Sequence, residues 1–218
     1  MTVHSDILQL TSYVVSTDPK ISVIPGFLTV EECEALINLS EKIGFTRSLV
    51  GRGKYALNDD DKSSMFLNQY SENRTSSSVH LVRSMDEALI GPIHERLSAL
   101  AKMPTNQLED LIVVKYEPGQ FFRPHHDGVF RPYTVFLYLN DLPPDSGGET
   151  RFPALGLRIR PRMGAAVVWG NTVSSRNEDG TFSTVEDERL VHEALPPTIG
   201  NVKYGVNCFF NEHPMTIH

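Results

Sequence analysis

Residues 116–127 read Y-E-P-G-Q-F-F-R-P-H-H-D, and the interpretation of the whole chain begins from this stretch. It ends with His125 and Asp127, two residues apart. In an extended strand, residues i and i+2 project from the same face, so one short strand can present an imidazole and a carboxylate side by side. His126 would point to the opposite face, which makes His125 the better candidate. The alternative is a surface histidine followed by a turn, because Asp127-Gly128 is itself a turn signal.

A second histidine would complete a metal-binding set. Two histidines and one carboxylate form the facial triad that holds Fe(II) and leaves the remaining positions open. His192, in R-L-V-H-E-A-L-P, begins an extended segment after the polar loop 171–188, and it is the candidate third ligand. The alternative is a strand histidine satisfied by ordinary hydrogen bonds.

Lys203 lies in G-N-V-K-Y-G-V-N, among residues typical of a buried strand. A buried lysine is costly unless it meets an anion. A dicarboxylate that chelates the iron at one end and pairs with Lys203 at the other would supply that anion. The alternative is a lysine at the start of a strand with its ammonium group in water.

Composition narrows the class of protein. A chain of 218 residues with 40% hydrophobic and 22% charged residues suits one globular domain. The net charge of −7 argues against a nucleic-acid surface, which needs a basic footprint. Cys33 and Cys208, the only cysteines, cannot make a disulfide framework or a thiolate zinc site. We see no membrane-span pattern and no secretory signal, so we expect a cytoplasmic or nuclear protein with no membrane partner.

The first half of the chain carries helical patterns. Residues 21–24 predict a strand, and Thr29 with Glu32 has capping-box spacing at the start of a helix that Gly44 can end. Ser84 with Glu87 repeats that spacing before a second helical region, which Pro92 can kink or divide. Between them, the long polar segment 46–80 is typical of either a disordered loop or a functional lid.

The second half carries strand patterns. Short apolar or aromatic runs are separated by Pro, Gly and Asp/Asn turns at residues 111–116, 134–139, 165–169 and 204–210. Many short strands with such punctuation predict a sandwich or a jelly roll.

Together these motifs resemble the prolyl 4-hydroxylase family of Fe(II)/2-oxoglutarate dioxygenases, of the collagen-type and plant or algal kind. The resemblance covers nearly the whole chain and includes P-G-F-L-T-V-E-E-C at 25–33, R-T-S-S at 74–77, G-G-E-T-R-F-P at 147–153 and P-R-M-G-A-A-V-V-W at 161–169. It implies a mainly β fold with N-terminal helices, in which helices flank a double-stranded β-helix (a cupin-like jelly roll). We expect a single domain over residues 1–218, with helical support and a lid loop at about 20–105 and the jelly-roll core at about 108–211.

The resemblance also implies roles for individual residues. Lys203 resembles the residue that binds the distal carboxylate of 2-oxoglutarate, Tyr116 resembles the tyrosine that reaches the same carboxylate, and Thr150 is expected on the same pocket wall. Residues 74–77 resemble the loop that closes over a peptide. The implied iron ligands are His125, Asp127 and His192, and the implied substrate residues are Arg74, Ser76, Ser77 and Phe209. Trp169 is expected to pack in the core beneath the iron.

The activity implied is that of a prolyl 4-hydroxylase. Such an enzyme uses Fe(II), 2-oxoglutarate, O2 and ascorbate, hydroxylates proline in a peptide or protein, and releases succinate and CO2. Two departures from the family pattern leave the peptide preference open: Tyr204 and Phe209 stand where the family carries tryptophan, and the spacing from His192 to Lys203 is one residue longer.

Three alternatives stay open at this point. The first is a 2-oxoglutarate-dependent hydroxylase of another residue or a small molecule. The second is a jelly-roll domain that binds a ligand without catalysis, which the intact triad and Lys203 disfavour. The third is a nucleic-acid demethylase, which the acidic net charge and the lysine anchor disfavour. The sequence does not predict an oligomeric state.

Overall fold

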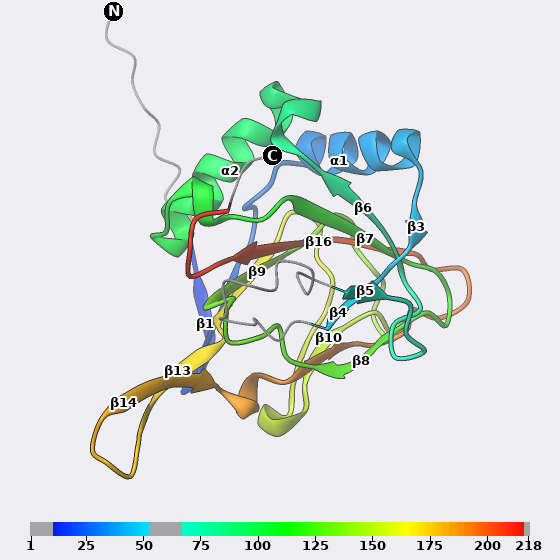
Figure 1. Cartoon of the computed structure of the whole chain (residues 1–218). Helices are drawn as coiled ribbons and strands as arrows, with labels where there is room; N and C mark the ends of the chain where they lie inside the picture. Colours follow the sequence, from blue (N-terminus) through cyan, green and yellow to red (C-terminus); the bar gives the residue numbers. More distant parts are fainter. Residues whose placement is uncertain (1–10, 53–66, 216–218) are drawn as a thin grey trace, which may run out of the picture.

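Two facing sheets form the body of the protein in the computed structural model, which describes residues 11–52 and 67–215 (Figure 1). The larger sheet has eight strands and the smaller has four. In spatial order, the larger sheet contains β1 (Tyr13–Thr17), β2 (Lys20–Ile24), β12 (Ala166–Gly170), β9 (Tyr133–Tyr138), β16 (Lys203–Phe210), β7 (Leu111–Tyr116), β6 (Ser77–Leu81) and β3 (Thr46–Arg47). The smaller contains β11 (Leu157–Ile159), β10 (Thr150–Phe152), β15 (His192–Ala194) and β8 (Phe122–His125). This mainly β architecture confirms the predicted jelly roll.

The four apolar runs expected to be strands are confirmed. The run 111–116 coincides with β7, and the other three match β9, β12 and β16 to within one residue at each end. Strand β1 lies at the edge of the larger sheet and pairs with β2. A further pair, β4 (Val50–Arg52) and β5 (Leu67–Gln69), flanks residues 53–66, so that part of the expected lid lies outside the described residues.

Helix α1 (Val30–Ile43) begins and ends where its sequence predicts. The Thr29 hydroxyl accepts a hydrogen bond from the Glu32 backbone N–H at 3.2 Å, and the Glu32 carboxylate accepts one from the Thr29 N–H at 2.9 Å. These reciprocal bonds satisfy two N–H groups that have no partner within the helix. At the other end, the Gly44 N–H donates to the carbonyl of Ser40.

Helix α2 (Glu87–Ala101) begins later than the capping-box spacing predicts. Ser84 lies in a 3-10 turn, η2 (Arg83–Met85), and the N-cap is Asp86, whose carboxylate accepts from the Leu89 N–H at 3.1 Å. The prediction of Ser84 as the cap was wrong, because the stronger acceptor stands directly before the first helical residue. Pro92 lies inside the helix and does not divide it. Neither α1 nor α2 is long and apolar enough to cross a membrane, and they are the two α-helices of the described residues.

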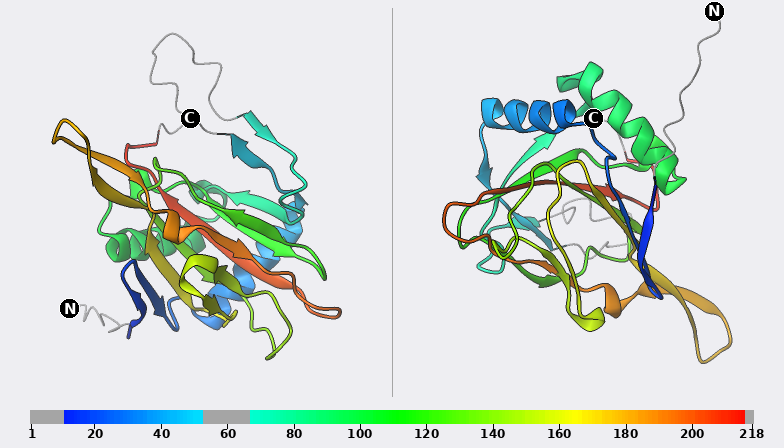
Figure 2. Two further views of the ribbon diagram at one scale, coloured as in Figure 1. Left: turned by 90° about the horizontal axis from the view of Figure 1, so that it is seen from below. Right: turned by 180° about the vertical axis from the view of Figure 1, so that it is seen from behind.

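Side chains of the larger sheet alternate between two cores. On the outer face, Val113 and Val135 pack in one cluster with Cys33 and Leu36 of α1 and Leu97 of α2. Both helices lie together on this side of the barrel (Figure 2). On the inner face, a second cluster fills the space between the sheets with Val114, Phe136, Trp169 and Phe152. This period-two pattern leaves the barrel interior available for the inward-facing residues of β7, β9 and β16.

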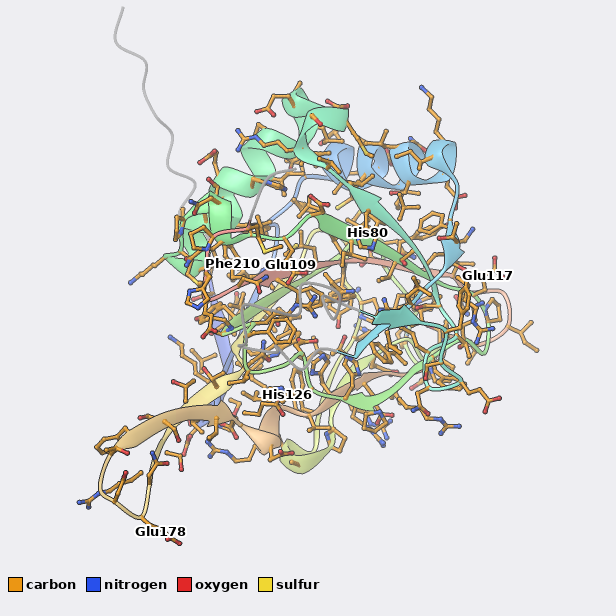
Figure 3. All side chains as sticks on the ribbon, viewed as in Figure 1. His80, Glu109, Glu117, His126, Glu178 and Phe210 are labelled. Carbon is orange, nitrogen blue, oxygen red and sulfur yellow. The ribbon has the colours of Figure 1, made fainter. Side chains whose placement is uncertain are left out.

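The polar segment 171–188 is a β-hairpin and not the loop that we expected. Strand β13 (Thr172–Arg176) pairs antiparallel with β14 (Phe182–Glu186), and Glu178 lies at the tip of the hairpin, away from the barrel (Figure 3). Most side chains of both strands are exposed or half-buried, so the sequence lacks the alternation of buried and exposed residues that identifies a strand. Three-residue 3-10 turns at η3 (Thr105–Gln107), η4 (Pro153–Leu155) and η5 (Glu188–Leu190) complete the described elements.

Candidate active site

Two strands of the smaller sheet bring the predicted iron ligands together. His192 at the start of β15 stands opposite His125 at the end of β8 in the antiparallel register, and Asp127 follows β8. The Nε2 atom of His125 lies 3.9 Å from Asp127 Oδ1, and that of His192 lies 3.7 Å from Asp127 Oδ2. The ligand atoms of all three residues lie within 4.8 Å of one another. Such a spacing allows one metal ion to contact all three.

Backbone hydrogen bonds orient both imidazoles. His125 Nδ1–H donates to the carbonyl of Arg123 at 2.9 Å, and His192 Nδ1–H donates to that of Leu190 at 3.0 Å. Each bond selects the tautomer whose Nε2 lone pair faces Asp127, which is the arrangement that a metal requires. Burial, with the neighbouring His192, lowers the pKa of His125 to about 3, so its imidazole is neutral at physiological pH.

Asp127 keeps its negative charge although it is buried. Burial alone would raise the pKa of this carboxyl group, but His192 and His125, with Arg131 and the Thr134 hydroxyl, outweigh burial and lower it. The two imidazole Nε2 atoms and the Asp127 carboxylate therefore face a common point, a donor set suited to Fe(II).

A chain of buried hydrogen bonds supports the Asp127 carboxylate. Thr134 Oγ1 donates to Asp127 Oδ2 at 2.7 Å, Asn171 Nδ2 donates to Thr134 Oγ1 at 2.7 Å, and Trp169 Nε1 donates to Asn171 Oδ1 at 2.8 Å. Asn171 is fully buried. Neither Thr134 nor Asn171 could be found from the sequence. A threonine within a strand and an amide at the edge of a polar segment carry no signal of the buried hydrogen bonds that they form. The Trp169 ring also packs 4.9 Å from that of His192, in the core position expected of it.

Lys203 lies in the barrel interior. Its side chain is fully buried on β16, opposite Tyr116 of β7. The Nζ atom lies 5.3, 5.1 and 5.4 Å from the ring centres of Tyr116, Phe136 and Tyr138. Within the described part of the chain, Nζ has no hydrogen-bond acceptor. Burial lowers the pKa of Lys203 to about 7. An ammonium group so placed fits the distal carboxylate of 2-oxoglutarate, and this orphaned donor is the feature by which the residues present fit that cosubstrate.

Tyr116 and Thr150 border the same interior. Tyr116 is buried, and burial raises the pKa of its hydroxyl, which the nearby Arg74 partly opposes. Thr150 Oγ1 accepts a hydrogen bond from the Tyr138 hydroxyl at 2.7 Å, which places it behind one of the rings that surround Lys203. The contact of either residue with 2-oxoglutarate stays a prediction.

The predicted substrate residues divide into two groups. Arg74 and Phe209 line a cleft of about 640 Å³ that reaches His125 and Asp127. Ser76 and Ser77 do not line it. Ser76 is buried, where its hydroxyl accepts from Arg74 Nε at 3.1 Å and donates to Ser48 Oγ at 2.9 Å. Ser77 begins β6 and pairs with Lys115 in the sheet. Ser76 therefore supports Arg74, and closure of a loop over a peptide stays a prediction.

Glu109 and Arg131, which also line the cleft, form an ion pair whose charges cancel. Arg131 donates from Nε and Nη2 to the two carboxylate oxygens of Glu109 at 2.6 and 2.7 Å, and its guanidinium carbon lies 3.9 Å from the centre of the Phe209 ring. Of the two residues that stand where the family carries tryptophan, only Phe209 lines the cleft. Tyr204 faces the helices, where its hydroxyl donates to Glu41 at 2.7 Å.

Comparison with known proteins gives concordant results. The family model described as "2OG-Fe(II) oxygenase superfamily" matches residues 111–211. "Probable prolyl 4-hydroxylase 3" of Arabidopsis thaliana is 31% identical over 217 residues, covering 86% of this chain and 68% of that relative. "Prolyl 4-hydroxylase 5" of the same plant is 36% identical over 177 residues, covering 77% of this chain and 54% of that relative. The chain thus spans between about half and two thirds of the length of these relatives.

Solved structures show the same fold. The viral collagen prolyl hydroxylase of Paramecium Bursaria Chlorella virus-1, in its 2-oxoglutarate complex, superposes with a TM-score of 0.62 at 22% identity, covering 87% of this chain and 94% of that one. A prolyl hydroxylase of Trichoplax adhaerens, in complex with a peptide fragment of the hypoxia inducible factor, gives a TM-score of 0.62 at 19% identity, covering 90% and 85%. With its jelly roll and its His-Asp-His set, the chain belongs to the prolyl 4-hydroxylase family of the 2-oxoglutarate and Fe(II)-dependent oxygenase superfamily.

Proposed function

We propose that this protein is a prolyl 4-hydroxylase that uses Fe(II), 2-oxoglutarate and O2 to hydroxylate proline in a peptide or protein. The observation that carries the proposal is the convergence of His125, Asp127 and His192 beside a cleft of about 640 Å³, which His125 and Asp127 line. Bound iron, with 2-oxoglutarate and O2, supplies the oxidising power for C–H hydroxylation with release of succinate and CO2, and ascorbate keeps the metal reduced.

The residues of this chain would position the reactants. His125, Asp127 and His192 would hold the metal on one side and leave its other positions open. Lys203 would bind the distal carboxylate of 2-oxoglutarate, exchanging an unpaired buried ammonium group for a charge-assisted hydrogen bond. Phe209 and the Arg131–Glu109 pair would hold the peptide against the mouth of the barrel, which places its C–H bond and keeps water away.

The test measures two products in one reaction. The protein loaded with Fe(II) is incubated with 2-oxoglutarate, ascorbate and a panel of proline-containing peptides, and succinate and peptide mass are recorded together. Succinate with a gain of one oxygen on proline supports the proposal. Succinate with oxygen gained on another residue or on a small molecule would replace it by the alternative hydroxylase. Iron binding without succinate formation under any condition would contradict the proposal and favour a jelly-roll domain that binds a ligand without catalysis.

We also propose a cytoplasmic or nuclear location. The support is that Cys33 and Cys208 are both buried free thiols, as a reducing compartment maintains them. A fluorescent fusion of the complete protein, viewed with markers for the secretory pathway, tests this proposal. Colocalisation with the secretory markers would contradict it.

A further inference from the structure

The cleft has charged side chains that do not balance one another. Three acidic residues line it: Glu109, which pairs with Arg131; Asp127, which belongs to the metal set; and Glu186, whose carboxylate lies 3.6 Å from His126 Nδ1. Three further arginines line the cleft, and none has an ion pair with any residue that the structure describes: Arg47, Arg74 and Arg123. In a chain whose net charge is −7, this is a local excess of positive charge.

The three arginines lie on one wall. Residues 71–74 connect them, because Arg47 Nη2 donates to the carbonyl of Ser71 at 3.4 Å and the Arg123 backbone N–H donates to the carbonyl of Asn73 at 2.8 Å. Arg74 itself forms a β-bridge with Phe122, the neighbour of Arg123. The wall therefore runs from the edge strand β3 of the larger sheet to β8 of the smaller sheet, the strand that carries His125.

Arg74 is the buried member of the wall. Its residue is 9% exposed, Nε donates to Ser76, Nη1 donates to the carbonyl of Leu49, and its guanidinium lies 4.7 Å above the Phe122 ring. The remaining nitrogen, Nη2, is buried and has no acceptor among the described residues. Leaving a buried charged donor unpaired is costly, and an arginine holds its charge even where burial lowers its pKa. Because Arg74 also lines the cleft, an oxyanion bound there could supply the missing acceptor.

We propose that this arginine wall selects peptides that carry an acidic side chain beside the target proline, with Arg74 donating hydrogen bonds to the carboxylate and Arg47 and Arg123 flanking it. The inference rests on the proposed function, since it names the substrate class of the same cleft. A carboxylate and a phosphorylated serine present the same kind of oxyanion to a guanidinium fork. The carboxylate is our choice, and the phosphorylated residue is an arm of the test.

The test compares matched peptides that differ in one residue. Each has one proline, with aspartate, asparagine, lysine or phosphoserine placed in turn at the flanking positions. Two quantities are measured: hydroxylation kinetics of the iron-loaded protein, and binding of fluorescein-labelled peptide by anisotropy without oxygen. We expect aspartate at the favoured position to lower both KM and Kd roughly ten-fold relative to asparagine, with kcat unchanged, because a hydrogen-bonded buried charge pair is worth about one factor of ten or more.

Variants of the exposed arginines avoid disturbing the fold. Arg47→Ala and Arg123→Ala should each reduce the aspartate preference roughly two- to five-fold, as exposed ion pairs do, and added salt should have the same effect. Arg123→Glu should shift the preference toward the lysine peptide. Arg158→Glu is the matched control: this arginine is exposed on β11 and does not line the cleft, so the preference should not change.

The outcomes separate the two proposals. Hydroxylation of all peptides with equal KM, or a preference that Arg123→Glu leaves intact, would overturn the arginine wall while leaving the hydroxylase in place. Arginine-dependent binding of the aspartate peptide without any hydroxylation would support the wall and contradict the hydroxylase. A phosphoserine peptide that binds more tightly than the aspartate peptide, in the same arginine-dependent manner, would retain the anion site and assign it to phosphorylated substrates.

Discussion

Replacing Lys203 by methionine should stabilise the fold and remove its response to 2-oxoglutarate. Burial lowers the pKa of this lysine from 10.5 to about 7. At about 1.4 kcal/mol for each pH unit, this corresponds to a cost of about 5 kcal/mol to keep the charged form in the folded protein. Methionine has a similar length and no charge, so it fits among the three aromatic rings that surround the side chain. The figure is an upper limit, because relaxation of the barrel reduces it.

The stabilisation should depend on pH in a defined direction. Above pH 10.5 the lysine is neutral in both folded and unfolded chains, and the cost is absent. As the pH falls toward 7, the unfolded chain binds a proton that the folded chain excludes, so wild-type stability falls. Below pH 7 the cost is complete. Urea unfolding at pH 6.5, 8 and 9.5 should therefore show the largest difference between variant and wild type at pH 6.5 and a difference of about 1 to 2 kcal/mol at pH 9.5.

Cosubstrate should stabilise the wild-type protein much more than the Lys203→Met variant. With Mn(II) in place of iron, 2-oxoglutarate at 100 times its Kd should stabilise the wild type by about 2.7 kcal/mol and the variant very little. Lys115→Met is the control, since Lys115 lies on the neighbouring strand β7 in an ion pair with Glu41 at 2.9 Å. That variant should lose at most about 1 kcal/mol and keep its response. A Lys203→Met protein that is less stable than wild type by the same amount at every pH would refute the reasoning.

The remaining predictions concern the metal set and its support. His192→Ala should abolish iron binding and hydroxylation, whereas His126→Ala should keep iron binding, as isothermal titration and succinate release can measure; product formed by the first variant would contradict the triad. Asn171→Ala should weaken metal affinity roughly 10- to 100-fold with the fold retained, because Thr134, which donates to the Asp127 carboxylate, loses the hydrogen bond from Asn171. Unchanged metal affinity would show that this chain of hydrogen bonds has only a structural role. Gly205→Ala should destabilise the protein by about 1–3 kcal/mol, since a Cβ there would meet an aromatic carbon at 2.3 Å, whereas Gly170→Ala, whose nearest neighbour is 3.6 Å away, should cost less; equal unfolding midpoints would contradict this.

Local signals predicted the elements that depend on local chemistry. The capping box at Thr29 and Glu32 forms as expected because both partners lie within four residues of each other. Strand β7 could be located because its first four residues, 111–114, form a continuous apolar run and residues on both faces of the strand are buried. The three metal ligands could be predicted for a similar reason, since His125 and Asp127 come from one short stretch and only His192 had to be found elsewhere.

Other features depend on contacts between distant segments. Strands β10 and β15 have three residues each, too few for a periodic pattern, and only their motifs marked them. The burial of Asn171 follows from its position between Trp169 and Thr134, which the fold alone brings together. The charge imbalance of the cleft was also hidden, because it depends on which carboxylates are already paired, as Glu109 is with Arg131.

Strand β16 has a consequence for how members of this fold can diverge. Lys203 and Phe209 lie six positions apart on the same strand. At about 3.3 Å per residue, the strand fixes a separation of roughly 20 Å between the lysine in the barrel interior and the phenylalanine at the cleft. Both neighbouring strands, β7 and β9, pair with β16. A residue inserted into β16 or deleted from it would therefore turn every later side chain of the strand to the other face. Sequence divergence within β16 is therefore confined to substitutions, such as phenylalanine for tryptophan, that keep the length of the strand. Segments at the rim, including residues 71–74, are free of that constraint, and target choice can evolve there while the oxidative machinery is inherited unchanged.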